Sequence, residues 1–286
     1  MNHIRSALAP GLHFVGVPIG TARDITLRAL DVLASADVLA AEDTRSLRKL
    51  MDIHGVPLEG RKIVALHDHS GAGAVERLVE RARDSSVAYA SEAGMPLIAD
   101  PGFELARAAH AAGITVTSAP GPSAVVTALA VAGLPTDAFH FAGFLPAARA
   151  ARKSALETLA QVPATLVFYE SPKRLSAMLA DAAAVLGAAR QGAVCRELTK
   201  KFEDVQRGTL EELAAHYAGT SVKGEIVVLI ERAKGTDVRE IDIDGMLRSA
   251  LDEMSVKDAA AMVAETLNIP RRRVYQRALD MARDKQ

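Results

Sequence analysis

The side chains best suited to chemistry follow a short apolar segment near the start of the chain. Val38–Ala41 is entirely apolar and predicts a buried strand, and Glu42-Asp43-Thr44-Arg45 comes directly after it. Polar side chains at the carboxyl end of an inner strand are costly to bury unless they line a crevice, and open α/β sheets bind ligands in a crevice at that edge. There a carboxylate can accept a proton, and the Arg45 guanidinium can stabilise a negative charge or hold a phosphate.

Three further loops have the composition of ligand-binding turns. They combine glycine with proline directly after predicted strands, at Pro18-Ile19-Gly20, Ser91-Glu92-Ala93-Gly94-Met95-Pro96 and Pro120-Gly121-Pro122-Ser123. Any one of them is most simply a tight turn between a strand and a helix. Because all three follow strands of one predicted sheet, together they favour a shared ligand cleft at its carboxyl edge.

The elements that must position these loops alternate along the first part of the chain. Apolar segments predict strands at 12–17, 37–41, 63–66, 87–91 and 114–117. Amphipathic segments between them predict helices, so we expect βαβ crossovers and a mostly parallel sheet. Asp24 or Thr26 can cap the first helix, and we expect Asp100 to cap a later one with Pro101 in its first turn.

A second α/β domain is predicted after the break at Gly133-Leu134-Pro135-Thr136. Its expected strands lie at 139–142, 165–169, 192–197, 203–207 and 225–231. Helices are expected at 171–186 and 209–216, and the order of the elements favours more antiparallel pairing than in the first domain.

The last fifty residues have a different character. Short amphipathic segments predict helices at 244–254, 256–267 and 271–283, with a turn at Asn268-Ile269-Pro270. Two helices joined by a turn, the second with a basic start, resemble a helix-turn-helix. We therefore expect two α/β domains at 1–122 and 123–234 with a cleft between them, a linker at 234–237, and a helical domain at 237–286.

Composition restricts the class of protein further. The 286 residues exceed one typical core, and the formal net charge of −1 gives no overall attraction to nucleic acid or a membrane. Any RNA must therefore be held by local basic patches. The one cysteine, Cys195, lies in an apolar run, which indicates a buried thiol and excludes a disulfide framework. No segment has the form of a signal peptide or a membrane span, so we expect a cytoplasmic protein.

Several motifs in order along the chain carry a resemblance to a known family. They read PIG at 18–20, DITLRAL at 24–30, AEDTR at 41–45, SEAGMP at 91–96, DPG at 100–102, PGPS at 120–123, FYESP at 168–172 and RELTKKFE at 196–203. In these motifs the chain resembles the tetrapyrrole-methylase-like superfamily of S-adenosylmethionine (SAM) methyltransferases. Within it, the resemblance is to the enzymes that methylate the ribose 2′-oxygen of a cytidine in 16S ribosomal RNA. It implies SAM as cofactor, 16S rRNA or the 30S subunit as partner, and a homodimer.

The resemblance also implies which residues form the SAM pocket. They are Pro18, Gly20, Ser91, Gly94, Pro120, Gly121, Ser123 and, from the second domain, Ser171. Glycine lets backbone approach a ligand closely, and helix starts offer N–H groups to a carboxylate. Glu92 and Met95 stand where we expect Asp and Thr in close relatives, so the chain departs from the family pattern at these two positions. His67 and His69 flank Asp68 without a third placed ligand, and the sulfonium of SAM already activates the methyl group, so we expect no metal site.

Transfer to a ribose hydroxyl requires removal of a proton. The carboxylates that could accept it are Glu42, Asp43, Glu170 and Glu197, and the cations that could stabilise an alkoxide or hold phosphates are Arg45, Arg196, Lys200 and Lys201. We take Glu42, Arg45, Glu197 and Lys200 as the catalytic candidates, with the identity of the base left open. Taken singly, each of these carboxylates and its neighbouring cation is as simply explained by an ordinary ion pair.

Basic clusters that could hold RNA are Arg45 with Arg48 and Lys49, Arg149 with Arg152 and Lys153, Lys173 with Arg174, and Arg271, Arg272, Arg273 and Arg277 in the tail. Two other functions remain open from the residues. One is methylation of a small tetrapyrrole on the same fold, which needs no helical tail. The other is a non-catalytic RNA-binding assembly factor.

Overall fold

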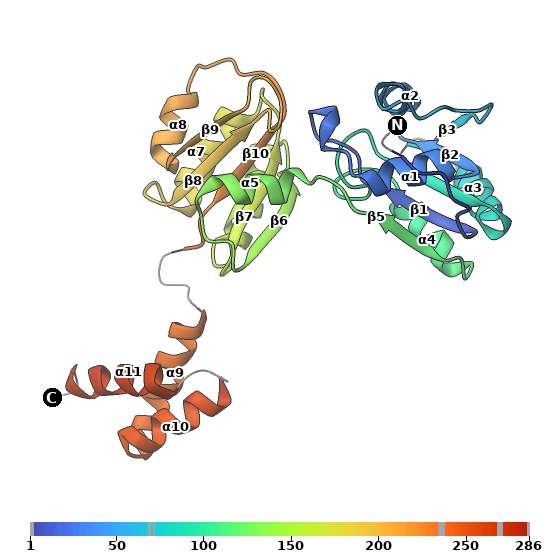
Figure 1. Ribbon diagram of the computed structural model, residues 1–286. Coiled ribbons are helices and arrows are strands. Elements are labelled where there is room, and N and C mark those ends of the chain that lie inside the picture. The colour runs from blue at the N-terminus through green and yellow to red at the C-terminus, as the bar shows by residue number, and fades with distance from the viewer. Residues whose placement is uncertain (1–2, 68–69, 71, 234–237, 268–270, 285–286) are drawn as a thin grey trace. The chain divides into compact units, whose positions relative to one another are not determined.

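The computed structural model describes residues 3–67, 70, 72–233, 238–267 and 271–284. Figure 1 shows two α/β parts and a helical C-terminal part. By contacts, one compact unit comprises residues 1–132 together with 194–205 and 223–227, and the other comprises 133–193, 206–222 and 228–286. The first unit therefore includes two segments from far along the chain.

The first sheet is parallel, as predicted. Its strands are β1 (Gly11–Val15), β2 (Val38–Ala41), β3 (Ile63–Ala65), β4 (Ser86–Ala90) and β5 (Val116–Ala119). They lie in the order β3-β2-β4-β1-β5, and each neighbouring pair is parallel. The last residue of β1, Val15, is in register with Ala90 and Ala119, the last residues of β4 and β5. The loops that follow these strands therefore begin side by side.

Helices cover both faces of this sheet. They are α1 (Leu27–Ser35), α2 (Thr44–Ile53), α3 (Ala72–Asp84) and α4 (Phe103–Ala111), with a short 3₁₀ helix η1 (Ala22–Asp24). A further helix, α5 (Ala124–Ala132), follows β5 along the chain. One core joins α1 and α2 to strand residues such as Val15 and Leu39, and the other joins α3 and α4 to Phe14 and Tyr89. Successive residues of β1 thus point into opposite cores, as the period of a strand requires.

The helix starts confirm one predicted cap and correct another. Thr26 caps α1 by accepting a hydrogen bond from the Ala29 N–H at 3.2 Å. Asp100 does not cap α4, because that helix begins only at Phe103 with Gly102 at its N-cap. Gly102 has φ +120°, and a Cβ there would lie 3.1 Å from the ring of buried Tyr89. The prediction was wrong because this conformation favours glycine and places the cap two residues later.

The second sheet has five strands in the order β6-β7-β10-β8-β9. They are β6 (Phe139–Phe144), β7 (Thr165–Glu170), β8 (Gln191–Arg196), β9 (Asp204–Thr209) and β10 (Ile226–Ile230). The accompanying helices are α6 (Arg149–Leu159), α7 (Leu175–Leu186) and α8 (Leu210–Tyr217). The helix expected from residue 171 begins at Leu175, because residues 171–174 form a turn in which Arg174 N–H donates to Ser171 O. Cys195 is fully buried, as predicted.

The C-terminal part has the three predicted helices. They are α9 (Val238–Glu253), α10 (Val256–Thr266) and α11 (Arg271–Asp284). Leu247, Val263 and Val274, one from each helix, are fully buried in their shared core. The predicted turn at 268–270 and linker at 234–237 lie outside the described residues. Among the residues that the structure describes, no helix is both long and apolar enough to cross a bilayer.

Candidate active site

The loops after β1, β4 and β5 are tied together at the carboxyl edge of the first sheet. Val17 and Gly94 exchange two backbone hydrogen bonds, at 2.9 and 3.1 Å, which join the β1 loop to the β4 loop. The Gly16 N–H donates to Ala119 O at 2.9 Å, which joins the β1 loop to the end of β5. The convergence expected from the sequence is therefore present in this unit.

Gly16 and Gly121 form the tightest contact at this edge. A Cβ at Gly16 would lie 2.6 Å from the Gly121 nitrogen, and one at Gly121 would lie 2.8 Å from the Gly16 Cα. Real Cβ atoms do not approach backbone so closely, so only glycine fits at either position. Met95, one of the departures from the family pattern, lies beside this contact and accepts a hydrogen bond from the Gly121 N–H at its Sδ, 3.2 Å away.

The structure places seven of the eight predicted cofactor residues at this edge. Those from the first unit are Pro18, Gly20, Ser91, Gly94, Pro120, Gly121 and Ser123, whereas Ser171 follows β7 in the second sheet. The Ser91 hydroxyl is buried and donates to Ala93 O at 3.2 Å, so it holds the β4 loop in shape. The Pro120 carbonyl accepts from the Thr26 hydroxyl at 3.2 Å, which fixes the β5 loop to the start of α1.

The two carboxylates that follow β2, Glu42 and Asp43, have different roles. Asp43 is the N-cap of α2 and accepts from the Arg45 and Ser46 N–H groups, and the first of these bonds is the main cause of the lowered pKa of Asp43. Glu42 is half-buried, and its Oε2 accepts from the Glu92 N–H at 3.2 Å. The Arg45 side chain is 92% exposed. Asp43 is thus occupied as a cap, whereas Glu42 stands at the sheet edge with no cation bound to it among the described residues.

Glu197 and Lys200 form an ion-pair network with Glu225. The Lys200 ammonium lies 3.0 Å from Glu197 Oε1 and 2.9 Å from Glu225 Oε2. The Glu225 N–H donates to Glu197 Oε1, and this bond together with Lys200 holds the pKa of Glu197 below its ordinary value. Burial alone would lower the pKa of Lys200, but the two carboxylates outweigh it and the pKa is raised. Both groups are therefore charged at neutral pH.

This network lies against the β1 loop. A Cβ at Gly20 would lie 2.6 Å from Lys200 Cγ and 2.6 Å from Thr199 Oγ1, and the Thr21 N–H donates to the Thr199 hydroxyl at 3.2 Å. Glu197 and Thr199 hold φ values of +52° and +64°, which side chains rarely adopt. The structure thus brings the cofactor candidate Gly20 and the catalytic candidate Lys200 into direct contact, on a loop held in a costly conformation.

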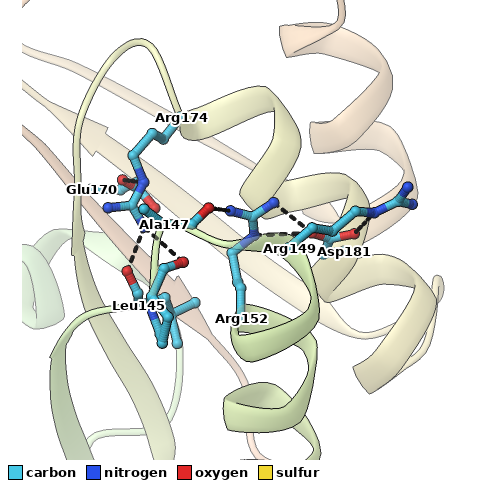
Figure 2. Close-up of polar contacts among 8 residues, drawn as sticks. Leu145, Ala147, Arg149, Arg152, Glu170, Arg174 and Asp181 are labelled. Carbon is cyan, nitrogen blue, oxygen red and sulfur yellow. Dashed lines mark hydrogen bonds and ion pairs between the residues drawn. The ribbon is translucent and has the colours of Figure 1, made fainter.

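Glu170 is an anchor of the second sheet. Figure 2 shows the Arg174 side chain between Glu170 and the loop that follows β6. Its guanidinium pairs with Glu170 Oε1 at 3.2 Å and donates to the carbonyls of Leu145 and Pro146. The same Glu170 oxygen accepts from the Ser171 N–H at 2.7 Å, so this pair fixes both Ser171 and the β6–α6 loop. Glu170 Oε2 is buried and has no hydrogen-bond partner among the described residues.

Three arginines predicted to hold RNA make ion pairs within the fold, and the prediction is wrong for Arg152, because that side chain is buried. Arg152 is 5% exposed and donates twice to Asp181 Oδ2, at 2.9 and 2.7 Å, and to Ala147 O, as Figure 2 shows. Arg174 is committed to Glu170, as above. Arg277 makes two hydrogen bonds to Asp244, at 2.7 and 2.6 Å, which join α11 to α9. Sequence proximity of basic residues did not reveal these carboxylate partners. Asp181 and Asp244 lie 29 and 33 positions from their arginines, whereas Glu170 lies four residues before Arg174.

Sequence reasoning missed Gly16, Thr199 and Glu225. Gly16 lies inside a predicted strand, and a glycine in that position is itself a signal of close backbone approach. Thr199 and Glu225 contact Gly20 and Lys200 only through the fold, and no local pattern identifies them. Of the two histidines considered as a metal pair, His67 donates its backbone N–H to Ser70, whereas Asp68 and His69 lie outside the described residues.

Comparisons with known proteins agree with this architecture. A family model described as Tetrapyrrole (Corrin/Porphyrin) Methylases matches residues 11–214, and one described as the RsmI C-terminal HTH domain matches residues 237–282. The solved structure of diphthine synthase superposes with a TM-score of 0.60 at 18% identity, over 77% of this chain and 89% of that one. Uroporphyrin-III C-methyltransferase from Thermus thermophilus, complexed with S-adenosylhomocysteine, gives 0.54 at 19% identity, over 78% and 98%. The fold and the matched model define a methyltransferase of the tetrapyrrole methylase class.

Closer relatives define the family within that class. Ribosomal RNA small subunit methyltransferase I of Mesorhizobium japonicum is 45% identical over 276 residues, which cover 96% of this chain and 93% of the relative. The proteins of the same name from Mycobacterium tuberculosis and Escherichia coli O157:H7 are 42% and 40% identical, over 93% and 94% of this chain and 94% of each relative. The chain belongs to the ribosomal RNA small subunit methyltransferase I family.

Proposed function

We propose that the protein transfers the methyl group of SAM to the ribose 2′-oxygen of a cytidine in 16S ribosomal RNA. One observation carries this proposal: the β1, β4 and β5 loops converge at one sheet edge, and the loop bearing Lys200 packs against the same β1 loop. Family membership supports the RNA substrate, and the resemblance in the RELTKKFE and FYESP motifs supports the cytidine 2′-oxygen. A ribosomal RNA substrate in turn supports a cytoplasmic location.

The edge of the first sheet fits SAM. The Gly16–Gly121 contact leaves no room for side chains, so backbone itself forms the surface there, as a flat nucleoside requires. Pro18, Gly94, Pro120 and Gly121 would hold the adenosine, and the start of α5 after Ser123 would offer N–H groups to the carboxylate. When bound, SAM supplies an activated methyl group on its sulfonium. The protein has to position the acceptor, and orientation alone lowers such barriers by up to roughly 7–11 kcal/mol.

Glu42 is the better of the two candidate bases. Glu197 is bonded to Lys200 and to the Glu225 N–H, and its lowered pKa makes it a weak proton acceptor. Glu42 has one carboxylate oxygen without a hydrogen-bond partner among the described residues and lies at the carboxyl edge of β2. We assign Glu42 as the group that accepts the 2′-hydroxyl proton, and Glu197 as the residue that positions Lys200.

Lys200 supplies a positive charge beside the β1 loop. Because its pKa is raised, it stays protonated throughout the neutral range. It can stabilise the developing alkoxide or a neighbouring phosphate. Arg48, Lys49 and Lys173 are exposed, and Arg45 is exposed although it pairs with Asp43 at 3.6 Å, so these basic side chains of the two α/β parts remain available to hold RNA.

Methylation of unmodified 30S subunits tests the proposal. Subunits from a strain that lacks the gene are incubated with the protein and isotopically labelled SAM, and labelled nucleosides are identified by mass spectrometry. We expect Glu42→Gln to lower turnover by about 10²- to 10⁴-fold with unchanged SAM affinity, because a general base contributes that factor. Glu92→Gln is the matched control, since it changes the neighbouring carboxylate and keeps the N–H that binds Glu42. Wild-type turnover in Glu42→Gln would remove Glu42 from this role.

The proposal includes a homodimer, and the same assays separate it from two alternative functions. The resemblance supports a homodimer, which light scattering of the purified protein tests directly; a monomeric mass at working concentration would contradict it. Methylation of a small tetrapyrrole in place of RNA would leave 30S subunits unlabelled while SAM still binds. If calorimetry detects no SAM binding, the non-catalytic RNA-binding factor is the remaining function.

A further inference from the structure

An open pocket of about 370 Å³ lies on the C-terminal helical part. Lys257 from the first turn of α10 and Arg271, Arg272 and Tyr275 from the first turns of α11 line it. Three cations and one aromatic ring therefore line one open pocket.

Among the residues that the structure describes, none neutralises the charges in this pocket. None of the three cations makes an ion pair with another residue that the structure describes, whereas Arg277 on the same helix is bonded twice to Asp244. The Arg271 guanidinium donates to the Lys257 carbonyl at 3.3 Å, which holds it at the pocket without cancelling its charge. Asp258, the acidic residue next to Lys257, accepts a hydrogen bond from the Ser255 hydroxyl at 2.6 Å in the α10 cap. The pocket is consequently suited to an anion.

The aromatic ring makes the pocket more selective than a phosphate site. Tyr275 is 40% exposed although it is a large aromatic residue of a well-packed helix. It stands four residues after Arg271, which places both on one face of α11. A ring with a free face beside several cations is the combination that binds single-stranded nucleic acid, because bases stack on the ring and the cations pair with phosphates. Paired bases in a duplex cannot offer a face in this way.

We propose that this pocket binds one unpaired nucleotide of the ribosomal RNA substrate. The base stacks on Tyr275, and the flanking phosphates contact Lys257, Arg271 and Arg272. The identity of the RNA rests on the proposed function, but the recognition of a single strand rests only on the pocket. The helical part then contributes its own point of attachment for the RNA.

Binding of a labelled single-stranded oligoribonucleotide to the full-length protein tests this. The probe is about 12 nucleotides long, within the range that single-strand sites cover, and affinity is followed by fluorescence anisotropy at several salt concentrations. We expect Tyr275→Ala to weaken binding by about tenfold, and Tyr275→Phe to bind as wild type because the ring remains. Replacing Arg271 and Arg272 by glutamine should weaken binding and reduce the salt slope by about 0.7 for each lost phosphate contact.

Arg248→Gln is the matched control. Arg248 is an exposed arginine of α9 that does not line the pocket, so its loss removes the same charge from the same part of the chain. An effect of Arg248→Gln equal to that of Arg271→Gln would show binding by overall charge and would overturn the proposal. Wild-type affinity in Tyr275→Ala, or equal binding of a duplex of the same length, would also overturn it.

A cross-linking experiment on the wild-type protein makes the test independent of folding in the variants. The same oligonucleotide carrying 5-iodouridine is irradiated with the protein, and the modified peptide is identified by mass spectrometry. We expect a cross-link at Tyr275, and an acidic peptide added as competitor should displace no RNA. Cross-links confined to the α/β parts would count against the proposal. If 30S subunits are not methylated but Tyr275 still cross-links, the proposed function fails and the pocket stands. If 30S subunits are methylated and Tyr275 never cross-links, the proposed function stands and the proposed nucleotide pocket fails.

Discussion

Replacing Gly121 by alanine should disturb the closest contact of the candidate SAM site. The added Cβ would lie 2.8 Å from the Cα and carbonyl carbon of Gly16 and 2.9 Å from its oxygen. These are backbone atoms, and Gly16 is itself hydrogen-bonded to Ala119, so no flexible side chain can move away. One of the two loops must shift from the sheet edge.

The loss of stability in Gly121→Ala follows from overpacking, because the added methyl group meets backbone that cannot move aside. Inserting a methyl group into a well-packed region typically costs about 1–3 kcal/mol, and for a part of this size that lowers the melting temperature by roughly 3–10 °C. The same shift displaces the backbone that would hold the adenosine. Since 1.4 kcal/mol is a factor of ten in affinity, we expect the dissociation constant of SAM to rise about tenfold or more.

Thermal melting and SAM calorimetry measure both effects, with Gly73→Ala as the matched control. Gly73 lies in α3 of the same unit, and a Cβ there would meet only the Nη1 end of the Arg77 side chain, at 3.3 Å. Alanine is a better helix former than glycine by up to about 1 kcal/mol, so this variant should be as stable as wild type or more so. The reasoning is refuted if Gly121→Ala melts and binds SAM as wild type does.

Three further predictions concern stability. Arg152→Leu should cost about 3 kcal/mol or more in urea unfolding, because it leaves the buried Asp181 carboxylate without its main partner; a loss below 1 kcal/mol would contradict this. The pKa values of Asp181 and Glu197 lie below their ordinary values of 3.8 and 4.5, so these groups stabilise the fold above that range, and stability should fall as acidification protonates them below about pH 4. Unfolding that is flat between pH 5 and pH 3 would oppose this. Thr26→Ala should destabilise by about 1 kcal/mol through the lost α1 cap, and Thr26→Ser should recover most of it; equal melting of both variants would refute the cap.

The sequence predicted the parts of the fold that depend on local pattern. Alternating apolar segments identified the strands of the first sheet, and Gly/Pro loops after them identified the edge where Val17, Gly94 and Gly121 meet. Parallel strands place their carboxyl ends together, so this convergence needed no long-range information. The same local reasoning found the three C-terminal helices.

What the sequence could not predict are contacts between distant segments. Thr199 bonds to Thr21 across 178 positions, and Arg152 bonds to Asp181 across 29. A cluster of arginines looks alike in sequence whether it is exposed or paired inside the fold, which is why Arg152 and Arg277 were assigned to RNA. The start of α4 was misplaced for a related reason, since the backbone of Gly102 and its contact with Tyr89 decide it.

Mapping the methylated nucleotide tests the central claim most directly. Unmodified 30S subunits are treated with the protein and methyl-labelled SAM, the 16S RNA is digested to nucleosides and fragments, and the label is located by mass spectrometry. We expect one cytidine labelled on its ribose, with label lost in Glu42→Gln and retained in Glu92→Gln. Label on a base, or no label in the RNA while SAM binds normally, would contradict it.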